Sequence, residues 1–330
     1  MRGSREALLP IATALALVVL AVGVAESVSW LGRPFPGFLV LRNRVVASAG
    51  LPHWPAVARG EIYQKEVVAM DGAAVESAVA IRDRVLALPP GTPVRYRFRG
   101  SSGEFERVIA TRRFAGRDYG LLFGVYLLNG LALAGTALGI LYLGRRHPAA
   151  GASVPVLWLA GLWSLTALDL YGPYRLFRLH ALCEVLLFPA ALHMALAFPR
   201  PNGFVRRHPG IVALPYFLAL GLGGLYQAGL GHPGTYVDAH LFATSALGVS
   251  LLTLIAMQVC RYLHPETAEV RCTLRIVAMG ALVALSLPVV LTIAEPVTGG
   301  RMSQNALGFT GFLFPLSIGY AVCRRGLLEF

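Results

Sequence analysis

Charged residues are scarce in this chain, and their scarcity excludes an ordinary soluble protein. Only 14% of the 330 residues are charged, 56% are hydrophobic, and the mean hydropathy is +0.62. Soluble domains contain about a quarter charged residues on average. The sequence therefore predicts an integral membrane protein in contact with the lipid bilayer. The net charge of +12 fits the arginine-rich inner loops of such a protein better than it fits binding to nucleic acid.

Lysine and cysteine are also rare. Lys65 is the only lysine, a skew toward arginine that we interpret as genome composition. The four cysteines are Cys183, Cys260, Cys272 and Cys323. None lies in the polar region of residues 35–116, so no disulfide framework is expected there. No CxxC or Cys/His spacing accompanies them, and we expect reduced, packed thiols rather than a metal site or a cofactor.

The motifs of membrane-embedded enzymes are missing as well. The sequence contains no His-Glu-x-x-His and no Gly-x-Ser-x-Gly. Apart from Glu184, the later apolar segments offer no obvious pair of buried acids for aspartyl chemistry. We therefore predict that the chain is not an enzyme. A transporter stays an alternative, although no internal repeat or pair of broken helices is evident.

Long apolar runs, in contrast, are abundant. Asp118–Leu143 contains more than the about 20 apolar residues that cross a bilayer as a helix. Leu8–Val24 follows Arg2 and Arg5 and predicts an uncleaved first helix, with a cleaved signal peptide as the alternative. Six more spans are predicted at Val154–Tyr171, Leu176–Phe198, Ile211–Leu230, Leu241–Tyr262, Leu274–Ala294 and Asn305–Val322. The expected fold class is thus an α-helical membrane protein of about eight spans.

The distribution of arginine predicts the orientation. Leaving aside the segment between the first two spans, which includes Arg33 and Arg117, the predicted outer loops carry Arg175, Arg178 and Arg301. The predicted inner segments carry Arg2, Arg5, Arg145, Arg146, Arg200, Arg206, Arg207, Arg261, Arg271, Arg275, Arg324 and Arg325. Cytoplasmic loops are enriched in positive charge. Both termini are therefore expected in the cytoplasm and residues 35–116 outside it.

The polar region of residues 35–116 reads as a compact α+β domain between a first helix (1–34) and a seven-helix bundle (117–330). Short strands are expected at Phe38–Val40 and Val67–Met70. Ser77 predicts the start of a helix that runs to about Leu88. Alternating apolar and charged residues then predict a hairpin that sets Arg99 opposite Glu104 and Arg97 opposite Glu106.

This order of elements resembles a bacterial PDZ domain. The resemblance covers about 80 residues and is carried by Phe35-Pro36-Gly37-Phe38, the strand ending in Asp71-Gly72, the helix after Ser77 and the hairpin Arg95–Ile109. It implies that Phe35, Gly37, Phe38 and Leu39 hold the carboxylate end of a peptide, which adds a strand to the sheet edge. Pro36 has no backbone N–H, so one donor of such a loop is missing. A spacer or dimer contact is the alternative use of the domain.

Three ionisable residues within the predicted spans are further site candidates. Asp169 lies near the outer end of its span, close in depth to Arg175 and Arg178. His180 and Glu184 are four residues apart and share a helix face. A charge at a helix centre needs a partner or a cavity. Two interpretations stay open: an outer polar cluster that fastens the third span to the fourth, or a ligand or proton site that opens outward.

The later spans resemble the membrane halves of multi-span bacterial sensor histidine kinases. The resemblance is carried by Leu192-His193 with Phe198-Pro199, and by Phe314–Val322 followed by Arg324-Arg325 and Leu327-Leu328. With a PDZ-like insertion after the first helix, the architecture is similar to the competence-type quorum-sensing kinases. Those kinases continue into a phospho-accepting helix and an ATP-binding domain, which residues 1–330 do not contain.

These resemblances imply a sensor in the inner membrane of a bacterium. A peptide or small-molecule signal outside would act on a cytoplasmic output, either a partner such as a histidine kinase or cyclase, or a further domain. A homodimer is compatible with this arrangement. The alternative function is a transporter or a membrane scaffold.

Overall fold

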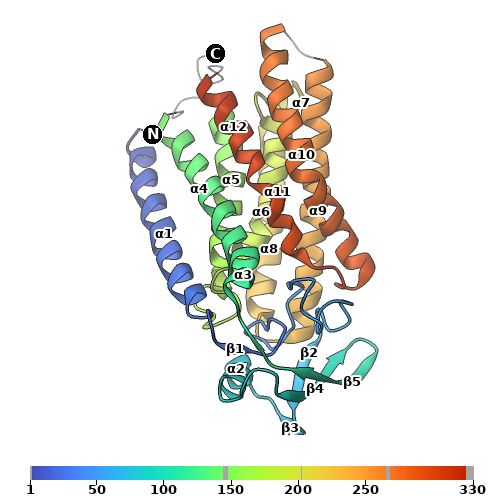
Figure 1. Ribbon diagram of the computed structural model, residues 1–330. Helices are drawn as coiled ribbons and strands as arrows, with labels where there is room; N and C mark the ends of the chain where they lie inside the picture. The colour runs from blue at the N-terminus through green and yellow to red at the C-terminus, as the bar shows by residue number, and fades with distance from the viewer. Residues whose placement is uncertain (1, 144–147, 202, 265–267, 325–330) are drawn as a thin grey trace.

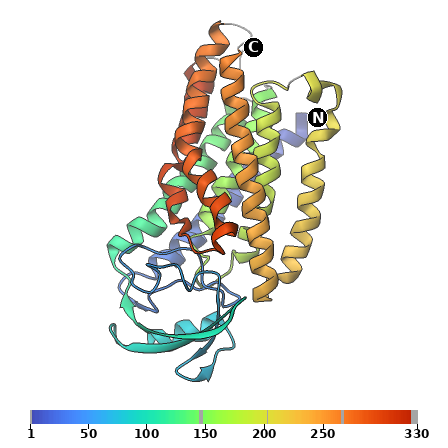
Figure 2. The same ribbon diagram turned by 90° about the vertical axis from the view of Figure 1, so that its right-hand side faces the viewer.

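The protein consists of a bundle of long helices and a small α+β domain at one end of it (Figure 1). A computed structural model describes residues 2–143, 148–201, 203–264 and 268–324. The start of α1 (Arg2–Val28) and the end of α12 (Leu313–Arg324) lie at the end of the bundle opposite to the domain. Seen from the side, the domain lies beneath the bundle (Figure 2). The cytoplasmic position of the chain ends stays a prediction.

The inserted domain (residues 35–116) is built on antiparallel strands. Its strands are β1 (Pro34–Phe35), β2 (Glu66–Met70), β3 (Ala73–Ala74), β4 (Pro93–Gly100), β5 (Gly103–Ala110) and β6 (Arg112–Arg113). Four of them form a sheet in the order β3-β2-β4-β5, and β1 pairs with β6. The β1–β6 pair therefore joins the segment that enters the domain to the segment that leaves it.

Residue alternation explains the hairpin β4–β5. Val94, Tyr96 and Phe98 point into the core, while the arginines between them are exposed. The register places Arg97 opposite Glu106 and Arg99 opposite Glu104, as predicted. Both arginines donate from Nε to the facing glutamate, at 3.1 and 2.9 Å. This strand face is thus a surface of paired charges.

Helix α2 (Ala78–Leu86) is the predicted helix of the domain, and it begins where Ser77 caps it. The Ser77 hydroxyl accepts a hydrogen bond from the Ala80 N–H at 3.1 Å. Ala78, Ile81 and Val85 are buried at helical spacing. These contacts attach α2 to the domain core.

The strand predicted at Phe38–Val40 does not form. The structure has only a single bridge there, between Val40 and Val46. The chain turns back at Arg44, whose φ of 69° is left-handed, so Val40 and Val46 face each other too briefly for a ladder. Residues 36–51 are instead fixed by burial of their apolar side chains.

The bundle contains the remaining helices. They are α3 (Gly116–Tyr119), the π-helical turn η1 (Gly120–Gly124), α4 (Val125–Leu143), α5 (Pro148–Thr166), α6 (Phe177–Ala197), α7 (Gly203–Arg207), the 3₁₀ turn η2 (Pro209–Val212), α8 (Leu214–Gly229), α9 (Pro233–Leu263), α10 (Ala268–Thr298), the 3₁₀ turn η3 (Gln304–Leu307), α11 (Gly308–Gly311) and α12. Helix α5 packs between α4 and α6, and α9 packs between α6 and α10. Helix α6 therefore lies at the centre of the bundle.

Six helical segments are long and apolar enough to cross a membrane, which makes this a multi-pass membrane protein. They are Leu8–Val28, Gly116–Tyr142, Phe177–Ala197, Pro209–Gly229, Pro233–Leu263 and Leu274–Thr298. The predicted span Val154–Tyr171 falls on the shorter helix α5, which ends at Thr166. The predicted span Asn305–Val322 is divided into η3, α11 and α12. The predicted total of eight spans stays a prediction.

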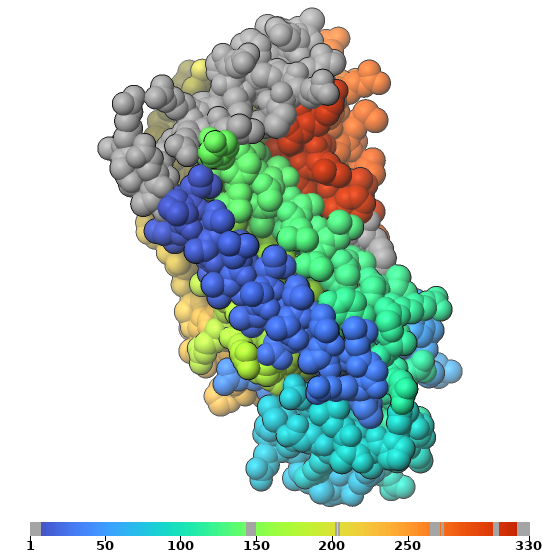
Figure 3. Space-filling view, turned by 60° about the vertical axis from the view of Figure 1, so that its left-hand side comes forward, coloured from blue at the N-terminus to red at the C-terminus, as the bar shows by residue number. Residues whose placement is uncertain are grey.

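Apolar side chains cover the outer surface of the bundle. Helix α1 runs along the outside of α4, above the domain (Figure 3). On α8, Phe217, Leu218 and Leu225 are largely exposed. Such surfaces are stable in lipid, where exposure of apolar groups has no hydrophobic cost.

Candidate functional site

The loop between α10 and η3 fastens the inserted domain to the bundle. The Gln304 N–H donates to the Ser48 carbonyl at 2.7 Å, and the Ser48 hydroxyl donates to the Gly300 carbonyl at 3.0 Å. At Gly60, an added β-carbon would overlap the carbonyl oxygen of Arg301, so the two backbones touch there. The domain therefore contacts the residues that immediately follow α10.

The side chain of Gln304 continues this contact into the bundle. Its amide donates to Glu295 on α10. Glu295 Oε1 lies 3.5 Å from His240 Nε2, and His240 Nδ1 lies 2.5 Å from Glu184 Oε1. Tyr226 on α8 donates to Glu184 Oε2 at 3.1 Å. These four bundle residues, Glu184, Tyr226, His240 and Glu295, form what we call the buried charge network.

The buried charge network is closed off from solvent. The exposed fractions are 2% for Glu184, 8% for His240 and 0% for Glu295. Burial of a charge is costly unless it is paired and hydrogen-bonded. Glu184 Oε1 faces His240 Nδ1, and Glu295 Oε1 faces His240 Nε2, so the imidazole has a carboxylate partner on each side. The two acids of the network thus share one basic group.

Aromatic packing fixes the orientation of the central histidine. The ring of Tyr236, one helical turn before His240 on α9, stacks on the imidazole with centroids 5.7 Å apart and planes 7° apart. Stacking leaves both ring nitrogens free to face the two carboxylates. His240 therefore bridges α6 and α10 from its position on α9.

Of the predicted site residues, Glu184 alone belongs to this network. The imidazole of His180, one turn earlier on α6, lies 3.0 Å from the Thr166 hydroxyl and stacks on Trp163. It connects α6 to α5. His180 and Glu184 lie on the same helix but have different partners.

Asp169 lies apart from both, in the loop between α5 and α6. It is fully buried, and its Oδ2 accepts a hydrogen bond from the Leu176 N–H at 2.7 Å, directly before α6. Burial raises the pKa of the Asp169 carboxyl from 3.8 to about 6. Arg175 lies close enough to lower the pKa of Asp169, but its guanidinium pairs with Glu26 at 3.1 Å, and Arg178 contacts Gln227. The expected outer cluster is therefore divided between a loop and the bundle core.

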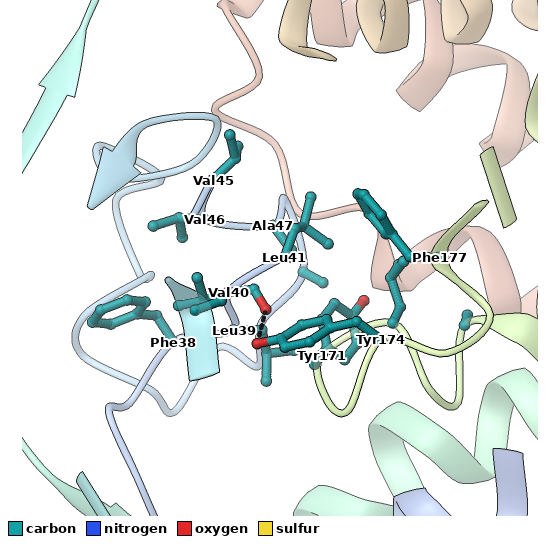
Figure 4. Packing of buried hydrophobic residues seen from close by; sticks show 14 of the residues in the cluster. Phe38, Leu39, Val40, Leu41, Val45, Val46, Ala47, Tyr171, Tyr174 and Phe177 are labelled. Atoms are coloured by element: carbon teal, nitrogen blue, oxygen red, sulfur yellow. Dashed lines mark hydrogen bonds between the residues drawn. The ribbon is translucent and has the colours of Figure 1, made fainter. Parts of the chain in front are cut away.

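The four candidates in the inserted domain are all buried. The side chains of Phe35, Phe38 and Leu39 belong to the core, and Gly37 has a left-handed φ of 83°. Figure 4 shows that the α5–α6 loop reaches this segment, where the Tyr174 hydroxyl donates to the Val40 carbonyl at 3.3 Å. A cavity of about 40 Å³ separates the segment from α2. The chain's own loop thus occupies part of the edge that was predicted to receive a peptide.

Sequence reasoning missed His240 and Gln304. The predicted span began at Leu241, whereas α9 begins at Pro233, so the histidine lies two turns inside the helix. Proline at the first helical position after His232 is a helix-start signal that would have extended the span. Gln304 carried no signal, because its role depends on contacts between distant segments.

Comparisons with known proteins identify no relative: no protein-family model, curated protein or solved structure matches the chain significantly. Within the described part of the chain, no group of three His, Cys, Asp or Glu residues is arranged to hold a metal ion.

Proposed function

We propose that the protein is a membrane receptor module in which the inserted domain, as a PDZ-like domain outside the cytoplasm, receives a signal and passes it to the helix bundle. One observation carries the proposal. Gln304 binds the backbone of Ser48 in the domain and the side chain of Glu295 in the buried charge network. A shift of the domain would move Gln304 and change the partners that remain for Glu295.

The α5–α6 loop supplies a second connection. Tyr174 binds Val40 beside α2, and Asp169 binds the first turn before α6 through Leu176. Helix α6 carries Glu184. A ligand that displaced Tyr174 from Val40 would free the loop that holds the start of α6.

Such a device works only if the ligand binds one of two bundle arrangements better than the other. A shift from 1:99 to 99:1 requires about 10⁴-fold tighter binding to the favoured arrangement. A buried group with two alternative sets of partners is suited to such a two-state change. His240, between two carboxylates, is the group that we assign to this role.

The distribution of arginine supports an output on the cytoplasmic side of the inner membrane. The output in this proposal is a partner such as a histidine kinase or cyclase, or a further domain, and a homodimer is compatible with it. Loss of signalling with intact folding in Glu184→Gln would support a functional network. A general loss of protein would mean that Glu184 serves only the fold.

The test uses the full chain in nanodiscs with a fluorophore on Cys260, which is exposed near the end of α9, after the other cysteines are replaced by serine. Peptides with free C-terminal carboxylates serve as probes. Binding is expected to change the fluorescence at Cys260. Gln304→Leu is expected to abolish that change while the peptides still bind.

Gln227→Leu is the matched control, because it removes a glutamine that contacts Arg178 outside the network. It is expected to leave the fluorescence change intact. A change that survives Gln304→Leu would refute the proposed path. Absence of peptide binding would refute the PDZ-like role of the domain.

A transporter is the second candidate function, and the buried charge network is the observation that favours it. Ionisable groups inside a membrane bundle are typical of ion and proton pathways. Uptake of an ion or proton into vesicles that contain the purified protein, lost in Glu184→Gln, would favour transport. A scaffold would show neither uptake nor a fluorescence change.

A further inference from the structure

A cavity of about 130 Å³ lies in the bundle against the buried charge network. Its wall is mostly apolar and comes from α4, α5, α6, α9, α10 and α12. The apolar residues that line it include Leu133, Leu157, Leu187, Leu251, Leu285 and Phe314. An engineered apolar cavity of about 150 Å³ binds benzene. The cavity therefore has the size and lining for one small ring.

One part of the cavity wall is polar. Glu184 and Gln304, both partners in the path from the domain, line it. Trp163 also lines it, and its indole N–H has no hydrogen-bond partner among the described residues. Two threonine hydroxyls at the wall, those of Thr244 and Thr292, bind their own helix backbones. Tyr126, Asn129 and Ser164 complete the polar part of the wall, and among the described residues that line the cavity Glu184 is the one carboxylate.

The charges around this wall do not balance when all groups are ionised. Glu184 and Glu295 carry two negative charges, and His240 supplies at most one positive charge. The other titratable groups that face them are the phenols of Tyr226 on α8 and Tyr236 on α9, and the imidazole of His180 on α6. Among the described residues, no arginine or lysine pairs with either carboxylate.

A buried excess negative charge is removed either by a proton or by a cation. A bound ammonium group would supply such a cation beside the Glu184 carboxylate, whose two oxygens also face His240 and Tyr226. Charge-assisted hydrogen bonds of this kind are about twice as strong as neutral ones.

We propose that this cavity binds a small lipophilic amine, with the apolar ring among the leucines and the ammonium group against Glu184. Binding breaks and forms no covalent bond. The ammonium ion enters as a cation, and its positive charge offsets the excess negative charge of the two carboxylates. As the ligand of the proposed receptor, the amine depends on the proposed function; as a binding event, it does not.

The first experiment measures binding by calorimetry to the full chain in nanodiscs. The probes are benzylamine, its neutral analogue benzyl alcohol and its anionic analogue benzoate. Benzylamine is expected to bind at least about tenfold more tightly than benzyl alcohol, and benzoate is expected not to bind.

Variants locate the site. Glu184→Gln is expected to remove the preference for benzylamine, and Glu61→Gln, which changes an exposed acid in the domain, is expected to retain it. Ala160→Phe, which fills the cavity from α5, is expected to remove binding of both benzylamine and benzyl alcohol. Because Ala160→Phe leaves the charges intact, it tests the cavity even if Glu184→Gln fails to fold.

The outcomes separate the two proposals. Equal affinity for benzylamine and benzyl alcohol, or unchanged binding in Ala160→Phe, would overturn the amine site. Benzylamine binding without any change at the Cys260 label would support the site and contradict the receptor role of the amine. A peptide response at Cys260 with no benzylamine binding would support the receptor and overturn the amine site.

Discussion

At the scale of single residues, His240 determines whether two carboxylates can be buried together. Glu184 and Glu295 lie on different helices, and the imidazole between them is the shared partner. Removal of one member of a buried pair leaves an uncompensated charge, which typically costs about 3–5 kcal/mol.

His240→Leu is therefore expected to destabilise the protein by about 3–5 kcal/mol, because it leaves the two acids without the imidazole. Thermal unfolding in detergent measures the effect. Adding Glu184→Gln and Glu295→Gln is expected to restore much of the lost stability, since the amides carry no charge. His232→Leu, an exposed position directly before α9, is the control. Unchanged stability in His240→Leu would contradict a charged network.

The buried carboxyl group of Asp169 is expected to make the stability of the folded protein depend on pH. Burial raises its pKa from 3.8 to about 6, so folding favours the protonated form. This contribution to stability is complete below about pH 4 and is lost as the pH rises through about 6. Asp169→Asn keeps an acceptor for the Leu176 N–H but does not titrate. The Tm of the wild type is expected to fall relative to the Tm of Asp169→Asn between pH 5 and pH 7.

The control for this measurement is Asp83→Asn, which changes an exposed carboxyl on α2. The difference in Tm between Asp83→Asn and the wild type is expected to stay constant over the same range of pH. If Asp169→Asn shows the same constant difference, Asp169 does not titrate near pH 6.

At the scale of elements, close approach between helices depends on small residues. Helices α4 and α5 meet at Gly161, where an added β-carbon would lie 2.6 Å from the Ala134 nitrogen. Gly130 makes a similar approach to Leu165 from the other helix. Small residues of this kind let membrane helices pack backbone to backbone. The packing of α4 against α5 therefore depends on two glycines, Gly130 and Gly161.

Gly161→Ala is expected to destabilise the bundle by about 1–3 kcal/mol, because the new methyl group forces α4 and α5 apart. Gly135→Ala, on α4 with open space around it, is the matched control and is expected to be neutral or to stabilise by up to about 1 kcal/mol. Thermal unfolding in detergent compares them. Equal effects of the two changes would show that the α4–α5 contact is not tight.

At the scale of the whole molecule, the inserted domain and the bundle are held together by several separate loops. Asn43 donates to the Leu230 carbonyl before α9, and His53 lies 2.6 Å from Asp118 at the start of α3. The α10–η3 loop adds the backbone contact between Gly60 and Arg301. Such a distributed interface lets a change in the domain reach several helices at once.

Gly60→Ala is expected to loosen the domain from the bundle, because its methyl group would overlap the Arg301 carbonyl. Limited proteolysis of the full chain is expected to cut the α10–η3 loop faster. Gly72→Ala is the matched control: both glycines have a positive φ, of 65° and 81°, but nothing lies within 4 Å of a β-carbon at Gly72. Both changes cost about 1–2 kcal/mol of backbone strain, so faster cutting in both would contradict a specific effect at Gly60.

Local patterns were enough to predict several elements. Alternation placed Arg97 opposite Glu106 in the hairpin, and Ser77 marked the start of α2. The predicted span Leu176–Phe198 closely matches α6 (Phe177–Ala197). Each of these features depends on residues within one element or one turn, so the sequence determines them without knowledge of the rest of the fold.

The partners of the buried charges were decided only by the tertiary structure. One of the two interpretations of the sequence placed Glu184 in an outer cluster with Asp169, whereas Glu184 meets His240 and Tyr226 on two other helices. Gln304 gained its role because the α10–η3 loop lies against the domain. A carboxylate in a membrane helix needs a partner, and the apolar residues around it in the sequence are enough to predict that need. Which partner it finds depends on helix packing between segments far apart in sequence, and no local pattern records that choice.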